Sequence, residues 1–274
     1  LDAALDPLER FTEEDVILIT YGDLIHGGDH SPLTTLSKFC GVQLQGCINT
    51  LHILPFFPSS SDRGFAVVDF DQVDPRLGTW ADLEDLETRF QLMFDGVINH
   101  VSSQSRWFQE FQNGHPHYRK FFTSFRAPEE LLPAERSMIF RPRTSDVLTP
   151  FATIDGPRYV WTTFSGDQVD LNYRNPEVLI RVLEVLLHYV RRGADLIRLD
   201  AVTYLWRRPG TPCVHLPETH ETVKFFREVL RSVAPHVALI TETNVPHADN
   251  VAYFGNGNDE AHMVYNFALP PLLL

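Results

Sequence analysis

A cation and a carboxylate lie two residues apart near the middle of the chain, where the mainly apolar segment 193–202 contains Arg198 and Asp200. Side chains at positions i and i+2 of a β-strand point to the same face, so we expect these two to lie together. A neighbouring cation lowers the pKa of a carboxyl group and keeps it ionised. An ionised, oriented carboxylate can be the nucleophile of covalent glycosyl transfer. Most Arg-x-Asp pairs are structural ion pairs, so this pair alone is weak evidence.

A second carboxylate, Glu242, follows the apolar segment 238–241, about one strand–helix unit after Asp200. We therefore expect the two carboxylates on neighbouring strands, in the retaining glycosidase arrangement with roughly 5–5.5 Å between them. Glu242 would need a raised pKa to protonate the leaving oxygen, and an ionised Asp200 would favour its protonation. Either carboxylate alone could instead cap a helix or bridge two loops.

A third polar group follows the expected strand 93–99, which leads into His100. The C-terminal ends of consecutive parallel strands meet at one face of a barrel, so His100, Asp200 and Glu242 are expected at a common site. His100 could instead be a hydrogen-bonded core histidine. Asp95, in the middle of its strand, is expected to have a structural role, ordering the loop backbone.

Apolar or β-branched segments alternate with helical patterns, which predicts a parallel sheet, open or closed. The expected strands are 16–21, 51–54, 93–99, 196–199, 237–241 and 263–267. Two helices are expected at Pro176–Arg192, followed by a capping Gly193, and at His220–Val233. Residues 101–172 show little periodicity but many aromatic side chains, which argues against disorder. We expect this segment to be an insertion on the C-terminal face of a barrel, where active sites lie.

The bulk composition limits the classes of partner. The 274 residues carry a net charge of −13, which argues against nucleic acid or an anionic membrane as a partner. No apolar run is long enough to span a membrane, and the first residues lack the zones of a signal peptide. The three cysteines, Cys40, Cys47 and Cys213, are too scattered for a disulfide framework or a zinc site. We therefore expect a cytoplasmic protein with free thiols.

Three motifs resemble the first three signature regions of the alpha-amylase superfamily, in the superfamily's order. They are Asp95–His100, Gly193–Val202 and Ile240–Glu242. Other segments resemble the sucrose phosphorylase-like branch: Ile53–Phe65, Val73–Trp80 and Val160–Asn172, with Gly210–His220 resembling members that act on glucosylglycerate or sucrose 6-phosphate.

The resemblance implies an α/β fold, a (β/α)8-type TIM barrel, here truncated after the sixth strand and carrying a B-type subdomain after strand 3. It divides the chain into a first barrel part at 1–100, an inserted subdomain B at 101–172 and a second barrel part at 173–274. Strands seven and eight and the C-terminal β-domain would be absent. The superfamily's fourth signature, a His-Asp pair, does not follow Glu242. Self-association or a partner chain would be needed to cover the open edges.

The resemblance also assigns the catalytic roles: Asp200 is the nucleophile, Glu242 the general acid/base, and Arg198 orients Asp200. The implied reaction transfers an α-glucosyl group from sucrose or a related α-glucoside to phosphate through a β-glucosyl-Asp200 intermediate, giving α-glucose 1-phosphate. The alternatives are a retaining α-glucoside hydrolase and a catalytically dead remnant that binds sugar or a partner. Inorganic phosphate is the co-substrate, and neither a metal nor a cofactor is expected.

The substrate-binding residues implied by the resemblance surround the glucosyl unit and its acceptor. They are Asp62, His100 and Phe164 at the glucose, Gln168 at the leaving group, and Tyr204 and Asn244 where the branch contacts phosphate or acceptor. Some sucrose phosphorylases have histidine at the position of Asn244, so the acceptor stays open. Five arginines are candidates for the phosphate site, because the guanidinium fork suits phosphate, or are solvated loop residues: Arg141, Arg143, Arg158, Arg207 and Arg208.

Overall fold

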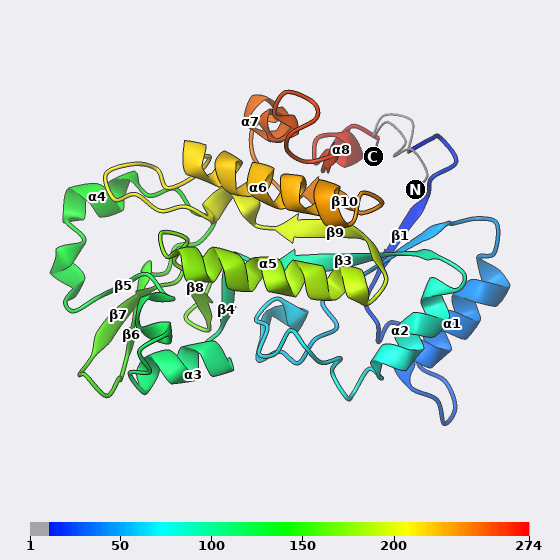
Figure 1. The fold of residues 1–274 in the computed structure, drawn as a ribbon, viewed down its shortest axis with the longest axis horizontal. Coiled ribbons are helices and arrows are strands. Elements are labelled where there is room, and N and C mark those ends of the chain that lie inside the picture. The colour runs from blue at the N-terminus through cyan, green and yellow to red at the C-terminus, as the bar shows by residue number, and fades with distance from the viewer. Residues whose placement is uncertain (1–10, 274) are drawn as a thin grey trace.

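A six-stranded parallel sheet forms the centre of the computed structural model, which describes residues 11–273 (Figure 1). Its strands, in spatial order, are β1 (Ile17–Thr20), β2 (Thr50–Ile53), β3 (Gln91–Val97), β9 (Ala194–Asp200), β10 (Ala238–Thr241) and β11 (Met263–Val264). All six predicted strands are present, and their order in space is their order along the chain. This arrangement brings the C-terminal ends of β3, β9 and β10 together.

Helices connect the successive strands, as the alternating pattern predicts. They are α1 (Pro32–Gln43), α2 (Trp80–Glu87), α5 (Pro176–Arg191) and α6 (Pro217–Val233). The predicted inward faces are confirmed, since Val178 and Leu186 of α5 and Phe226 of α6 are buried. Helix α6 begins three residues before the predicted start, because Pro217 suits the first turn of a helix.

Gly193 ends α5, as predicted, and connects it directly to β9. Its φ of +85° lies in the left-handed region that glycine adopts without steric cost. The close helix–strand connection fixes where β9 begins, and therefore where Arg198 and Asp200 lie along the sheet.

The segment between β3 and α5 is ordered and forms two small antiparallel sheets. Strand β4 (His100–Ser102) pairs with β8 (Gln168–Asp170), while β7 (Arg158–Trp161) lies between β5 (Ser124–Phe125) and β6 (Leu148–Phe151). Helices α3 (Arg106–Gln112) and α4 (Pro133–Met138) complete it. Strands this short produce no detectable periodicity in the sequence. The proposed division of the chain at residues 100 and 172 stays a prediction.

The two faces of the sheet differ in chemistry. Alternate residues such as Leu92 and Phe94 pack against the helices in the main core. The opposite face carries a small apolar cluster that includes Met93 and Leu196, and beyond it the polar side chains at the strand ends. Within residues 11–273 no strand pairs with the outer edge of β1 or β11, so the sheet is open.

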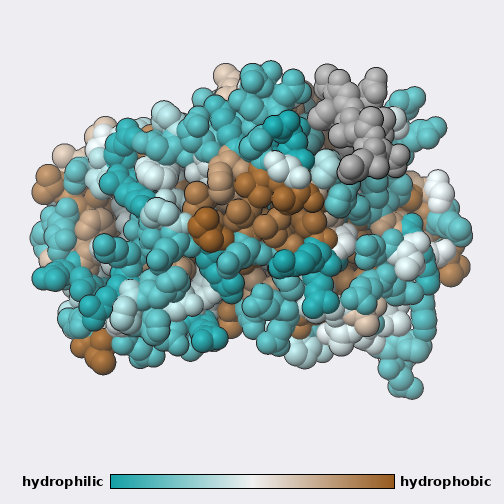
Figure 2. Space-filling model, viewed as in Figure 1, coloured by the Kyte–Doolittle hydropathy of each residue, from teal (hydrophilic) through white to brown (hydrophobic). Residues whose placement is uncertain are grey.

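The molecular surface is mixed. Figure 2 shows apolar side chains gathered in the middle of one face, in the region of α5 and α6, where Ile180 is half-exposed. The two shortest helices near the C-terminus are α7 (His247–Val251) and α8 (Leu269–Leu273). None of the helices in the described part of the chain is long and apolar enough to cross a membrane. The three cysteines are free thiols.

Candidate active site

Arg198 and Asp200 lie on the same face of β9, as the two-residue spacing predicts. Arg198 Nη1 donates to Asp200 Oδ1 at 2.9 Å, and both side chains are about nine-tenths buried. Asp200 is the last residue of β9, so its carboxylate lies at the C-terminal edge of the sheet. The strand therefore presents a carboxylate that a cation holds in one orientation.

Asp95 is a full member of this cluster, which the sequence interpretation missed. It lies opposite Arg198 in the register of β3 and β9, and its completely buried carboxylate pairs with the Arg198 guanidinium. Its other oxygen lies 2.8 Å from His52 Nε2 on β2. Asp95 thus contacts two strand side chains, and the expected role in ordering a loop backbone is wrong. A lone histidine in the buried segment 50–53 was the available signal for this contact.

Glu242 follows β10 directly and is brought to the same cluster, because β10 pairs with β9 in parallel. Its Oε1 lies 3.9 Å from Arg198 Nη2, and its Oε2 accepts from the backbone N–H of Ala201 at 3.2 Å. Ala201 has a φ of +49°, a left-handed conformation that costs alanine about 1–2 kcal/mol. The backbone immediately after Asp200 is therefore bent so that its N–H group faces the second carboxylate.

The electrostatics of Asp200 differ from the sequence expectation. Burial raises the pKa of Asp200; Arg198 opposes this shift, and the nearby carboxylates of Glu242 and Asp95 reinforce it, so that the pKa is about 7. Arg198 lowers the pKa as expected, but burial outweighs this effect and the two neighbouring carboxylates add to it, so the expectation that the cation decides the protonation of Asp200 is wrong. Asp200 is thus able to change protonation near neutral pH.

A second polar cluster surrounds His100, which is fully buried. Its Nε2 lies 2.8 Å from the backbone carbonyl of Phe65 and 3.1 Å from Gln168 Nε2. Gln168 Nε2 in turn donates to Asp62 Oδ2 at 2.9 Å. Burial lowers the pKa of His100, so the neutral imidazole is favoured. The structure therefore brings three of the predicted sugar-binding residues together: Gln168 donates to Asp62, and His100 beside them donates its Nε2–H to the Phe65 carbonyl.

Phe65 connects the carboxylate cluster around Arg198 with the cluster around His100, and Phe164 connects His100 with Tyr204. The Phe65 ring centroid lies 5.7 Å from the Arg198 guanidinium carbon, while its carbonyl contacts His100. The Phe164 ring lies 5.3 Å from the His100 ring and 5.4 Å from the Tyr204 ring. Burial and the charge of Glu242 raise the pKa of Tyr204 to about 12, so this phenol stays neutral. Phe65, to which the sequence analysis assigned no role, thus lies against both clusters.

Asn244 is the one predicted site residue without a described link to this group. Its side chain is exposed, two residues after Glu242, and among residues 11–273 no hydrogen bond, ion pair or ring contact connects it to the others. Among the arginines proposed for phosphate, Arg143 is at the site, with its guanidinium carbon 5.7 Å from the Phe164 ring centroid. Arg208 pairs with Glu218, and Arg141 donates to the carbonyls of residues 162 and 163.

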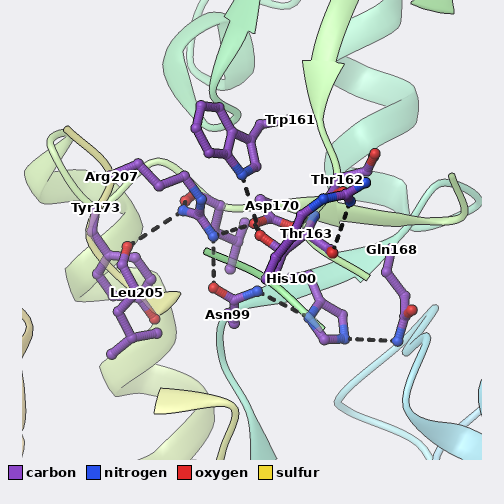
Figure 3. A network of polar contacts seen from close by, with 12 residues as sticks. Asn99, His100, Trp161, Thr162, Thr163, Gln168, Asp170, Tyr173, Leu205 and Arg207 are labelled. Carbon is purple, nitrogen blue, oxygen red and sulfur yellow. Dashed lines mark hydrogen bonds and ion pairs between the residues drawn. The ribbon is translucent and has the colours of Figure 1, made fainter. Parts of the chain in front are cut away.

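Arg207 is buried and belongs to a polar network behind His100 (Figure 3). Its guanidinium pairs with Asp170 and donates to Asn99 Oδ1 at 2.6 Å, and Asn99 Nδ2 lies 3.2 Å from His100 Nδ1. Since the Asn99 oxygen is used by Arg207, its amide nitrogen faces His100 Nδ1 as a donor. The charge of Arg207 is already neutralised, so it is unsuited to the phosphate role considered from the sequence. Its observed role is to support His100.

Among residues 11–273 there is no group of three or more His, Cys, Asp or Glu side chains arranged to hold an ion. The chemistry available at the strand ends is that of two carboxylates, Asp200 and Glu242, with the cation that they share with Asp95 and a neutral histidine.

Comparison with known proteins agrees with this geometry. Residues 44–272 match the model of the alpha-amylase catalytic domain. The chain is 53% identical over 264 residues to a glucosylglycerate phosphorylase of Allomeiothermus silvanus, covering 96% of this chain and 47% of that protein. It is 48% identical over 267 residues to a glucosylglycerate phosphorylase of Escherichia coli K12, covering 97% and 47%.

A solved structure shows the same fold. The crystal structure of sucrose 6F-phosphate phosphorylase from Thermoanaerobacter thermosaccharolyticum matches with a TM-score of 0.82 and 29% identity, covering 95% of this chain and 53% of that one. The chain thus spans about half the length of the relatives it matches. Its six parallel strands are those of an alpha-amylase-type TIM barrel, and the chain belongs to the alpha-amylase family.

Proposed function

We propose that the protein takes part in phosphorolysis of an α-glucoside, transferring the glucosyl group to phosphate with retention of configuration. The observation that carries the proposal is the position of Arg198, which contacts Asp200 at 2.9 Å and lies 3.9 Å from Glu242 at the ends of adjacent strands. Relatives named glucosylglycerate phosphorylase support the reaction class and make glucosylglycerate the first substrate to test. Sucrose and sucrose 6-phosphate are the next candidates.

In the proposed first half-reaction, protonated Glu242 gives its proton to the glycosidic oxygen as the bond from that oxygen to the anomeric carbon breaks. A carboxylate oxygen of Asp200 bonds to the anomeric carbon and forms the β-glucosyl ester. Arg198 holds Asp200 in position. It also stabilises the negative charge that returns to Asp200 when the ester breaks in the second half-reaction. Retention of configuration follows from two successive displacements at the same carbon.

In the second half-reaction, a phosphate oxygen attacks the anomeric carbon, the ester bond to Asp200 breaks, and Glu242 takes the proton from phosphate. The products are α-glucose 1-phosphate and the free enzyme. His100, Gln168 and Asp62 are proposed to hold the glucose hydroxyls and the leaving group, with Phe164 as an apolar wall. Arg143 is the proposed phosphate contact, because it is the candidate arginine that lies beside Phe164.

The proposal is tested by incubating the protein with glucosylglycerate and phosphate and measuring glucose 1-phosphate. Phosphate-dependent release that Asp200→Asn abolishes supports it. Release of free glucose at a rate independent of phosphate would instead identify a hydrolase. Saturable binding of sugar without any turnover would identify a binding protein and contradict the proposal. Parallel reactions with sucrose and sucrose 6-phosphate define the leaving group.

A further inference from the structure

A cavity of about 420 Å³ lies outside the candidate active site and is lined by cations. Its charged lining residues are all basic: Arg119, Lys120, Arg158, Arg174 and Arg207. None of the three carboxylates of the active-site cluster, nor Tyr204, lines it. A purely basic cavity is unexpected in a chain whose net charge is −13.

Three of these cations have charge available for a ligand. Arg207 is neutralised by Asp170, and Arg119 lies 3.7 Å from Asp155. For Lys120, Arg158 and Arg174, no carboxylate lies within ion-pair distance in the described part of the chain. Three cations around one cavity repel one another, and an anion between them would remove that repulsion.

The rim of the cavity is held in place by hydrogen bonds that do not neutralise it. Asn172 Nδ2 donates to the backbone carbonyl of Lys120 at 3.0 Å, and its Oδ1 accepts from the backbone N–H of Arg174 at 3.3 Å. Arg174 Nη2 donates to the backbone carbonyl of Arg207 at 3.2 Å. Asn172 therefore connects the segments that contain Lys120 and Arg174. The backbone carbonyl of Arg207 orients the Arg174 guanidinium without neutralising its charge.

The walls supply apolar surface beside the cations. Trp161, Tyr173 and Leu205 lie next to Arg207 in the wall (Figure 3), but all three are buried, so the apolar surface open to a ligand comes mainly from Trp206. Trp206 is partly exposed on the same lining. A ligand with both an anionic group and a less polar body matches such a surface better than a simple inorganic ion does.

We infer that this cavity is a binding site for a small phosphorylated metabolite, whose phosphate is held by Lys120, Arg158 and Arg174. Arginine forks bind phosphate oxygens with two parallel hydrogen bonds, and lysine adds a point charge. The site is separate from the carboxylates at Asp200 and Glu242. It therefore does not depend on the proposed glucosyl transfer.

The test is calorimetric titration of the protein with pyrophosphate and with glycerol 3-phosphate, at fixed ionic strength. Arg158→Gln and Arg174→Gln are each expected to weaken binding about tenfold or more, since each removes a charged hydrogen-bond donor. Arg191→Gln, an exposed arginine at the end of α5 that lines no part of this cavity, is the control for the change of charge. It is expected to change affinity less than about twofold.

Asp200→Asn distinguishes the two sites, because it alters the active-site cluster and leaves the cavity intact. Unchanged binding by this variant, with loss in Arg158→Gln and Arg174→Gln, supports the inference. Binding that Asp200→Asn abolishes, or that Arg191→Gln weakens as much as the two cavity variants do, would overturn it. So would the absence of saturable binding of either probe.

Discussion

Arg198 of β9 and Asp95 of β3 occupy the same register position on neighbouring parallel strands, and their side chains form an ion pair in which Asp95 is completely buried. The pair places the guanidinium so that its other contacts reach Asp200 and Glu242. The orientation of the proposed nucleophile therefore depends on a carboxylate that does not itself lie at the strand end.

Arg198→Met is expected to destabilise the fold by about 3–5 kcal/mol, because it leaves the charge of Asp95 buried without its cation. Urea denaturation followed by circular dichroism measures this loss. Arg231→Met is the matched control, since Arg231 pairs with Glu228 on an exposed helix surface, where water screens the pair, and should cost far less. Equal effects of the two substitutions would contradict a buried role for the Arg198–Asp95 pair.

Asp200→Asn is expected to stabilise the fold at pH 8 by about 1–4 kcal/mol. Burial raises the pKa of Asp200 to about 7 from an ordinary value of 3.8, so the folded protein retains a proton that the unfolded chain has lost. The contribution of Asp200 to wild-type stability therefore falls as the pH rises from about 4 to 7, and the variant lacks this loss.

The measurement is the free energy of unfolding of both proteins between pH 4 and pH 8. The difference between them should grow with pH and become small near pH 4. Asp29→Asn, the same substitution at an exposed carboxylate outside the site, is the matched control. A pH-independent difference, or an Asp200→Asn protein that is less stable at pH 8, would show that burial is not the main influence on the pKa of Asp200.

Gly64→Ala is expected to disturb the turn that carries Asp62. Gly64 has a φ of +109°, and a Cβ there would lie 2.5 Å from the backbone oxygen of Pro55, which cannot move away easily. Gly46 also has a positive φ, +78°, but a Cβ there meets nothing within 4 Å. Gly46→Ala should therefore cost about 1 kcal/mol from backbone strain, and Gly64→Ala clearly more. Thermal unfolding of the two variants checks this, and equal losses would be inconsistent with the contact to Pro55.

Arg207→Met is expected to cost about 3–5 kcal/mol, because Asp170 is then left charged and buried. Adding Asp170→Asn should restore part of this loss, since the uncompensated charge is removed. A double-mutant cycle based on urea denaturation measures the coupling between the two residues. Strictly additive effects would mean that the buried pair does not act as a unit.

The sequence was sufficient to predict the six strands of the central sheet and the meeting of their C-terminal ends at one site. Alternation of apolar side chains along 194–200 predicts that Arg198 and Asp200 share a face, and the repeated strand–helix pattern predicts that Glu242 lies beside them. These features are local or follow from the order of the elements. The short strands between β3 and α5 were missed, because two to four residues are too few to show a period.

Long-range partners were not predictable in the same way. Asp95 was assigned to a loop contact because its pairing with Arg198 depends on the register between β3 and β9. Arg207 was considered for phosphate because nothing in its neighbourhood along the chain reveals Asp170. The direction of the pKa shift of Asp200 depends on burial and on how many carboxylates share Arg198, which only the fold determines.

The central claim is that Asp200 is the nucleophile, and covalent trapping tests it most directly. The Glu242→Gln variant is incubated with α-glucosyl fluoride, whose leaving group needs no protonation, so the ester can form while its breakdown lacks the general base. Mass spectrometry of the digested protein should then show one added glucosyl unit on the peptide that contains Asp200, and none when Asp200→Asn is also present. A glucosyl unit on another residue, or no adduct on Asp200 despite release of fluoride, would contradict the account.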